Sequence, residues 1–243
     1  LTSNSFNANL LVLQPYGLEQ EVYEINRQAD LLSRESIRQY NAAGSLKHCY
    51  VAGSIGPTDK MTSLSPDVAD PGYRSIHFDQ LVGAYQQQAR GLVDGGVDAF
   101  LIETVFDTLN AKAALYAVNQ VMRQTHKKLP VMVSVTISGD SGRTLSGQTV
   151  EAFYNALQPF SPFSLGLNCS FGPMRLLPYL ERLSEKSTLP VSAHPNAGLP
   201  NELGDYDTSA REMASEIEKY FEKGLVNIVG GCCGSRPEHI REI

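Results

Sequence analysis

Residues 163–194 read FSLGLNCSFGPMRLLPYLERLSEKSTLPVSAH and carry the clearest indication of the architecture. They begin with a short apolar run at 163–167, continue through a helix-like segment at 174–185, and end in a second apolar run at 191–194. Short runs that are apolar on both faces are typical of buried parallel strands, and two parallel strands need a crossover such as a helix. This stretch therefore predicts a strand–helix–strand unit of an α/β protein.

The same alternation of short apolar runs and helix-like segments repeats along the chain. Further helices are expected at residues 19–42, 78–94, 108–125, 149–157 and 209–222. Further strands are expected at residues 48–52, 97–102, 131–137 and 226–231. With residues 1–6 counted as the end of one more strand, the nearest closed architecture is a (β/α)8 TIM-type barrel, which typically has ~250 residues. The chain is then expected to lack the barrel's first strand and the end of its last helix, which begins at Pro237.

An open, doubly wound sheet is the alternative fold. It is less favoured because no G-x-G-x-x-G motif follows any early strand. The chain has 243 residues, of which 42% are hydrophobic and 19% charged, and this composition allows one large core. No low-complexity linker interrupts it, so we expect a single barrel domain over residues 1–243, partial in extent.

Charge and cysteine content exclude several classes of protein. A net charge of −6 argues against a nucleic-acid partner, which usually requires a basic face. No apolar run approaches the ~20 residues that span a bilayer, and no charged leader precedes an apolar block, so we expect no membrane partner. Of the four cysteines, Cys232 and Cys233 are adjacent, which is poor geometry for a disulfide between them. A soluble protein of the reducing cytoplasm is predicted.

Three cysteines follow predicted strands. Cys169 lies in Gly166-Leu-Asn-Cys-Ser, and Cys232 and Cys233 lie in Gly230-Gly-Cys-Cys-Gly. Because the active sites of barrels are built at the carboxyl ends of the strands, these thiols could converge on one tetrahedral metal ion. The alternative is that each is a small buried hydrophobic residue. That interpretation is retained for Cys49, which lies inside or just before a strand.

Short motifs from one end of the chain to the other point to a single family. They are Asn4-Ser-Phe-Asn-Ala, Val51-Ala-Gly-Ser-Ile-Gly-Pro-Thr, Leu101-Ile-Glu-Thr, Gly142-Arg-Thr-Leu-Ser-Gly, Gly166-Leu-Asn-Cys-Ser, His194-Pro-Asn-Ala-Gly-Leu-Pro, and Val226-Asn-Ile-Val-Gly-Gly-Cys-Cys-Gly with Pro237-Glu-His-Ile. These runs resemble the homocysteine methyltransferase family, and most of all the N-terminal module of cobalamin-dependent methionine synthase. The family's first strand, with its Asp-Gly-rich loop, has no counterpart in this sequence.

The resemblance implies a zinc-dependent enzyme of methionine biosynthesis. Zinc held by Cys169, Cys232 and Cys233 would activate the thiolate of homocysteine, which accepts a methyl group from methylcobalamin. Cobalamin and folate would be held by other modules of the same or an associated polypeptide. Within the same family, betaine or S-methylmethionine could be the donor instead.

Four more residues are expected at the site. Glu103 ends an apolar run, and the resemblance implies that it binds the amino group of homocysteine. Ser54 is expected to bind the substrate carboxylate, and Asn168 to orient either the metal loop or the substrate. Asn196 is expected to be the weak fourth zinc ligand at rest. Turn-forming or capping roles are the alternatives for these polar residues, and Asp107 is expected only to cap the following helix.

Two other classes compete with this hypothesis. A non-catalytic barrel could bind zinc in a closed site, which requires a fourth protein ligand, and His194 is the one available near the three cysteines. A sugar- or phosphate-handling barrel is less favoured because no pair of catalytic carboxylates stands out.

Overall fold

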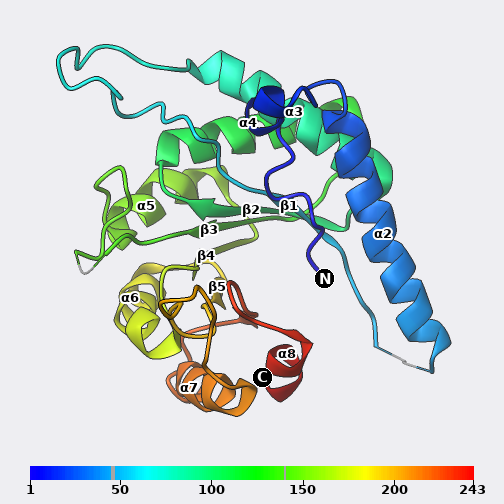
Figure 1. Ribbon diagram of the computed structural model, residues 1–243, viewed down its shortest axis with the longest axis vertical. Coiled ribbons are helices and arrows are strands. Elements are labelled where there is room, and N and C mark those ends of the chain that lie inside the picture. Colours follow the sequence, from blue (N-terminus) through cyan, green and yellow to red (C-terminus); the bar gives the residue numbers. More distant parts are fainter. Residues whose placement is uncertain (45–46, 140) are drawn as a thin grey trace. The chain divides into compact units, whose positions relative to one another are not determined.

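The computed structural model describes residues 1–44, 47–139 and 141–243. These residues form six strands in one sheet, hydrogen-bonded in the order β1-β2-β3-β4-β5-β6 (Figure 1). The strands are β1 (Ala52–Ile55), β2 (Ala99–Val105), β3 (Val131–Val135), β4 (Ser164–Asn168), β5 (Val191–His194) and β6 (Ile228–Val229). The pairs β1/β2, β4/β5 and β5/β6 are parallel. The α/β class and the parallel sheet are therefore confirmed, and an eight-stranded barrel is not observed.

Helices alternate with these strands, as the sequence predicted. They are α1 (Leu10–Leu13), α2 (Val22–Ala42), α3 (Phe78–Gly95), α4 (Thr108–Gln124), α5 (Val150–Leu157), α6 (Pro173–Lys186), α7 (Ala210–Glu222) and α8 (Pro237–Glu242). Two 3-10 turns, η1 (Gln14–Tyr16) and η2 (Gln158–Phe160), follow α1 and α5. Local capping explains the starts of two helices. The Asp107 carboxylate accepts from Leu109 N and Asn110 N at the start of α4, as expected, and Ser209 with Glu212 forms a capping box at α7.

The strand expected at residues 1–6 is not formed; only a single parallel bridge, Thr2 to Ala52, is present. Beyond that bridge the neighbouring strand pairs with side chains. The Ser3 hydroxyl accepts from Ser54 N, and the Ser5 hydroxyl donates to Ser54 O. These hydroxyls occupy the backbone groups with which a regular strand would pair.

The strand predicted at 48–52 also begins later, at Ala52. The backbone N–H of Val51 donates to the side chain of Asp98 at 2.7 Å. That hydrogen bond takes the donor that strand pairing would use, so the regular ladder with β2 starts one residue later.

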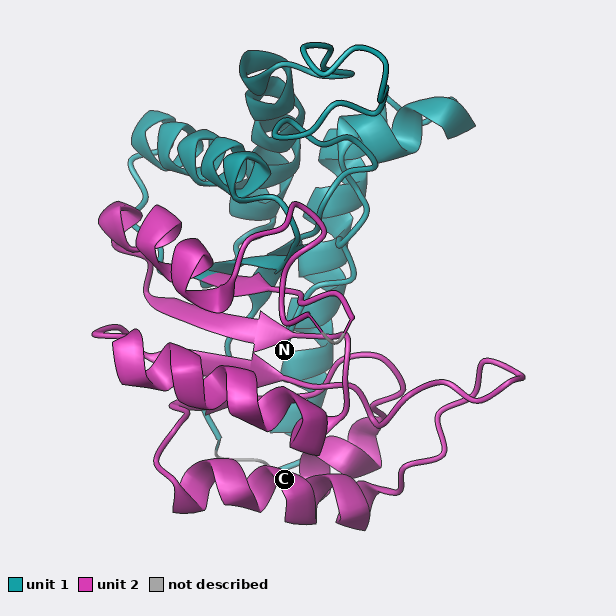
Figure 2. Ribbon diagram, turned by 90° about the vertical axis from the view of Figure 1, so that its left-hand side faces the viewer, with its two compact units in different colours: residues 1–132 teal, residues 133–243 magenta. Residues whose placement is uncertain are grey.

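The described chain divides into two compact units, residues 1–132 and 133–243 (Figure 2). In the first unit, α3 packs against α2 and α4. A Cβ at Gly91 of α3 would lie 2.4 Å from Tyr23 O of α2, so glycine is required for this close approach. The prediction of one domain over residues 1–243 stays a prediction.

The second unit carries its own apolar core. Fully buried side chains from β4, α6 and α7 form it: Leu165, Leu167, Leu176, Leu180, Leu183, Met213, Ile217 and Tyr220. A Cβ at Gly166 would lie 2.0 Å from the Ser192 hydroxyl, so only glycine allows β4 and β5 to lie this close. The backbone pairing of β4 with β5 and of β5 with β6 holds the carboxyl ends of these three strands at one edge of the sheet.

None of the helices in the described ranges combines the length and the apolar character needed to cross a membrane.

Candidate metal centre

The turn after β4 positions Cys169. Cys169 and Ser170 both have positive φ, 63° and 66°, a left-handed conformation that costs non-glycine residues about 1–3 kcal/mol. Hydrogen bonds hold this turn in place. Cys169 N donates to His194 O at 2.9 Å, and the Ser170 hydroxyl lies 2.6 Å from that of Thr136. Strain maintained by the surrounding contacts is typical of a functional position.

The loop after β6 presents Cys232 and Cys233. The segment that follows β5 holds it through three hydrogen bonds: Cys232 N to Pro195 O at 2.8 Å, Ala197 N to Cys233 O at 2.9 Å, and Cys233 N to Asn196 Oδ1 at 3.1 Å. The flanking glycines have a steric cause. A Cβ at Gly231 would lie 2.2 Å from the Ser235 hydroxyl, and one at Gly234 would lie 2.2 Å from the Tyr206 ring.

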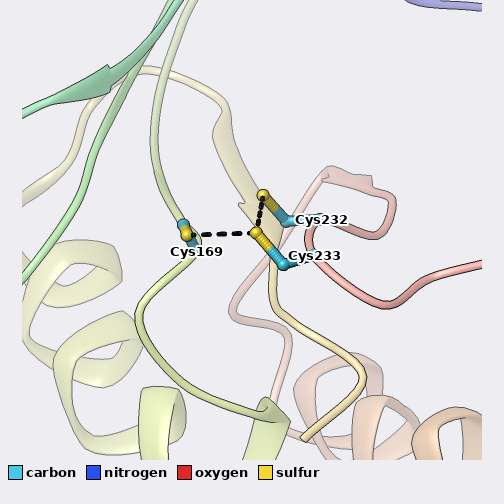
Figure 3. Close-up of side chains that lie close together, drawn as sticks. All are labelled: Cys169, Cys232 and Cys233. Atoms are coloured by element: carbon cyan, nitrogen blue, oxygen red, sulfur yellow. Dashed lines mark hydrogen bonds between the residues drawn. The ribbon is translucent and has the colours of Figure 1, made fainter. Parts of the chain in front are cut away.

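The three thiols converge (Figure 3). The Cys169 and Cys233 sulfurs are 3.6 Å apart, those of Cys232 and Cys233 are 4.0 Å apart, and all three lie within 4.8 Å of one another. Tetrahedral zinc with Zn–S distances of about 2.3 Å requires sulfurs separated by about 3.8 Å. The donor set and its spacing therefore fit a zinc ion, and the expected convergence of Cys169, Cys232 and Cys233 is observed.

The three thiols do not ionise equally. Hydrogen bonds from Cys169 and then Cys232 lower the pKa of Cys233, whereas contacts with Cys169 and Cys233 raise the pKa of Cys232. Cys233 is therefore the first of the three to become a thiolate. Metal coordination deprotonates thiols outright, so the lowered pKa of Cys233 favours capture of a cation.

Glu103 and Ser54 lie in the unit of residues 1–132. The Ser54 hydroxyl is buried and donates to Glu103 Oε1 at 2.5 Å, near the carboxyl end of β2. Glu103 also lines a small pocket with Gly56, Tyr85 and Asn110. Its carboxylate therefore lies near the carboxyl end of β2, beside this small pocket. The Ser54 hydroxyl contacts this carboxylate, whereas the sequence suggested a role at the substrate carboxylate.

Comparison with known proteins places the chain in a family. The model of the family described as homocysteine S-methyltransferase matches residues 1–243. This chain belongs to the homocysteine S-methyltransferase family. The family predicted from the sequence motifs is thereby confirmed.

Solved structures with the same fold include a homocysteine methyltransferase, MmuM, from Escherichia coli. Its metallated form has a TM-score of 0.76 and 19% sequence identity, and its oxidized form has a TM-score of 0.77 and 18% identity. Both matches cover 99% of this chain and 77% of that chain. At this level of identity the likeness establishes the fold alone.

Two asparagines of this family member contact the cysteines. Asn196 is buried and accepts from the backbone N–H of Cys233, so its oxygen orients the metal loop in the structure. Asn168 accepts from the Ser134 hydroxyl at 2.6 Å, and its amide lies 4.0 Å from the Cys232 sulfur. The orienting role expected for Asn168 therefore has a geometric basis, and ligation by Asn196 stays a prediction.

Tyr206 was not found by sequence reasoning. The Tyr206 ring packs against Gly234, next to the two cysteines of that loop, and burial followed by the charge of Cys233 raises the pKa of Tyr206. The only signal in the sequence was its position in the loop between β5 and α7, which follows the carboxyl end of a strand. His194 is half-buried, and desolvation lowers its pKa to about 4; it does not join the three thiols in the metal-sized cluster found among the described residues.

Replacing Asn196 with alanine is expected to weaken zinc binding by about 10- to 100-fold, because the backbone of Cys233 loses the acceptor that orients it. Competition with a chelator of known zinc affinity measures this change. The exposed Asn155 of α5 is a matched control, since the same substitution there touches no part of the site. A zinc affinity unaltered in Asn196→Ala would contradict the orienting role.

Proposed function

We propose that Cys169, Cys232 and Cys233 hold a zinc ion and that the protein transfers a methyl group to homocysteine, giving methionine. The observation that carries this proposal is the spacing of the three sulfurs, 3.6 and 4.0 Å for the two closest pairs, in a member of this family. Bound zinc would allow a thiol with an ordinary pKa of about 8.5 to bind as a thiolate at neutral pH.

An open coordination position is required for this role. Within residues 1–44, 47–139 and 141–243, no histidine, aspartate or glutamate joins the three thiols. This supports an open catalytic site over the closed site of a structural zinc. In this proposal Asn168 and Asn196 act through the cysteines: Asn168 directs its amide at the Cys232 sulfur, and Asn196 holds the backbone of Cys233.

Glu103 holds the ammonium group of homocysteine in this proposal. A carboxylate partly removed from water binds an ammonium through a charge-assisted hydrogen bond, which also selects an amino acid over a simple thiol. The orientation of Glu103 by the Ser54 hydroxyl supports the assignment, because an oriented carboxylate loses less entropy on binding.

Methylcobalamin, held by another module, is the proposed donor, and the bond between sulfur and methyl forms as the bond between methyl and carrier breaks. The motifs shared with cobalamin-dependent methionine synthase support this donor and a folate module as a further partner. The four cysteines are free, which suits the reducing cytoplasm. S-methylmethionine and betaine are the alternative donors.

Methyl transfer to homocysteine tests the function. The zinc-loaded protein is expected to form methionine from homocysteine and added methylcobalamin. Activity should disappear on chelation and return with zinc, because the thiol of homocysteine needs the metal to ionise at neutral pH. Mass spectrometry of the product measures this. Parallel reactions with S-methylmethionine and betaine identify the donor. Methionine formation that persists without zinc would contradict the proposal.

A further inference from the structure

Three buried serines form a closed ring of hydrogen bonds beside Glu103. The backbone N–H of Ser54 donates to the Ser3 hydroxyl at 3.0 Å, and the Ser3 and Ser5 hydroxyls lie 2.8 Å apart. The Ser5 hydroxyl donates to the carbonyl of Ser54 at 2.7 Å. All three serines are almost fully buried.

The direction of every proton in this ring is fixed. A hydroxyl has one proton, and that of Ser5 is directed at the Ser54 carbonyl. Ser3 must therefore donate to Ser5, and Ser3 in turn accepts from Ser54 N. The amide of Gln88 donates to Ser5 O at 2.8 Å and ties the ring to α3. Both backbone groups of Ser54 are thus held by side chains rather than by a neighbouring strand.

The ring uses only the backbone groups of Ser54, so the Ser54 hydroxyl is available for another partner. It lies 2.5 Å from Glu103 Oε1, a distance typical of a charge-assisted hydrogen bond from a hydroxyl to a carboxylate. An ionised carboxylate only accepts, so Ser54 is the donor. Because the ring holds the backbone of Ser54 in place, the hydrogen bond from its hydroxyl constrains the orientation of the Glu103 carboxylate.

We infer that Ser54 is a positioning residue that aims Glu103 at the ammonium group of an amino-acid thiol, with Ser3 and Ser5 fixing Ser54. This inference rests on the proposed role of Glu103 as the ammonium site. It assigns Ser54 no contact with the substrate itself. Its consequence is selectivity: Ser54 affects the recognition of homocysteine and not that of a thiol lacking the amino group.

The test compares two ligands by calorimetry on the zinc-loaded protein. They are homocysteine and 4-mercaptobutyrate, which is homocysteine without its amino group. Ser54→Ala is expected to lower the affinity for homocysteine about tenfold, the effect of losing a hydrogen bond to a charged group. The affinity for 4-mercaptobutyrate should change by no more than about twofold. Zinc content should be unchanged.

A double-mutant cycle with Glu103→Gln completes the test. Since Ser54 acts through Glu103, Ser54→Ala should weaken homocysteine no further in the Glu103→Gln background. Ser164→Ala is the matched control, because the Ser164 hydroxyl is also buried in a strand and has no hydrogen-bond partner among the described residues. It should change neither affinity.

The outcomes separate this inference from the proposed function. Equal weakening of both ligands by Ser54→Ala, or an additive loss in the double mutant, contradicts the positioning role. Weakening of homocysteine by Glu103→Gln without any effect of Ser54→Ala contradicts it as well, and leaves the proposed function intact. If Glu103→Gln leaves the affinity for homocysteine unchanged, Glu103 does not bind the ammonium group, and the positioning role of Ser54 is contradicted as well. Thermal unfolding of each variant verifies that the fold persists.

Discussion

Serine in place of any one of Cys169, Cys232 or Cys233 is expected to remove most of the bound zinc. Each substitution takes away a soft thiolate whose sulfur lies within 4.8 Å of the other two, and two thiolates alone bind zinc weakly. Atomic emission spectroscopy after gel filtration measures the metal content of each variant. Methyl transfer should fall together with zinc.

Cys49 provides the matched control for this series. Its sulfur lies 3.7 Å from the backbone oxygen of Lys47, and it does not belong to the cluster of three thiols found among the described residues. Cys49→Ser should therefore retain full zinc. Stoichiometric zinc with normal homocysteine binding in the Cys232 and Cys233 variants would refute the metal site.

The fold should survive the loss of zinc in all four variants. The core around the cysteine-bearing strands is formed by apolar side chains of β4, α6 and α7, and no cysteine belongs to it. Small zinc-dependent domains unfold without metal because they lack such a core. Circular dichroism should show unchanged helix content, so a loss of activity would report on the site.

Glu103→Ala is expected to weaken homocysteine binding by about 2–4 kcal/mol, which is about 30- to 1,000-fold in affinity. The ammonium group of the substrate would lose its charged partner at a position that is partly shielded from water. Zinc content should stay unchanged, because the three metal-binding thiols come from other loops. Isothermal titration calorimetry of the zinc-loaded protein measures the affinity.

The same titrations, repeated in buffers of different ionisation enthalpy, locate the defect. Homocysteine must release its thiol proton to bind the metal, and Glu103→Ala should retain this proton release while losing affinity. Glu35→Ala is the control, since that carboxylate of α2 pairs with Arg38 and does not line the pocket beside Glu103. Wild-type affinity in Glu103→Ala would reduce Glu103 to a structural residue.

The α/β class, the helices α2 to α7, the strands β2 to β6 to within a few residues, and the family could all be predicted from the sequence. Local signals are sufficient for these features, because apolar periodicity, glycine loops and caps such as Asp107 act between near neighbours. The sequence also predicted that Cys169, Cys232 and Cys233 could share one site. The carboxyl ends of parallel strands in one sheet lie at the same edge, whatever their separation along the chain.

The pairing of the polar side chains depends on the tertiary structure. Ser3 and Ser5 replace an expected strand, Ser54 contacts Glu103, and Asn196 contacts Cys233. Each of these contacts joins residues from different loops or strands, and a displacement of a few tenths of an ångström would weaken it. Hydrogen bonds weaken steeply with distance and angle, so no local pattern in the sequence can specify them.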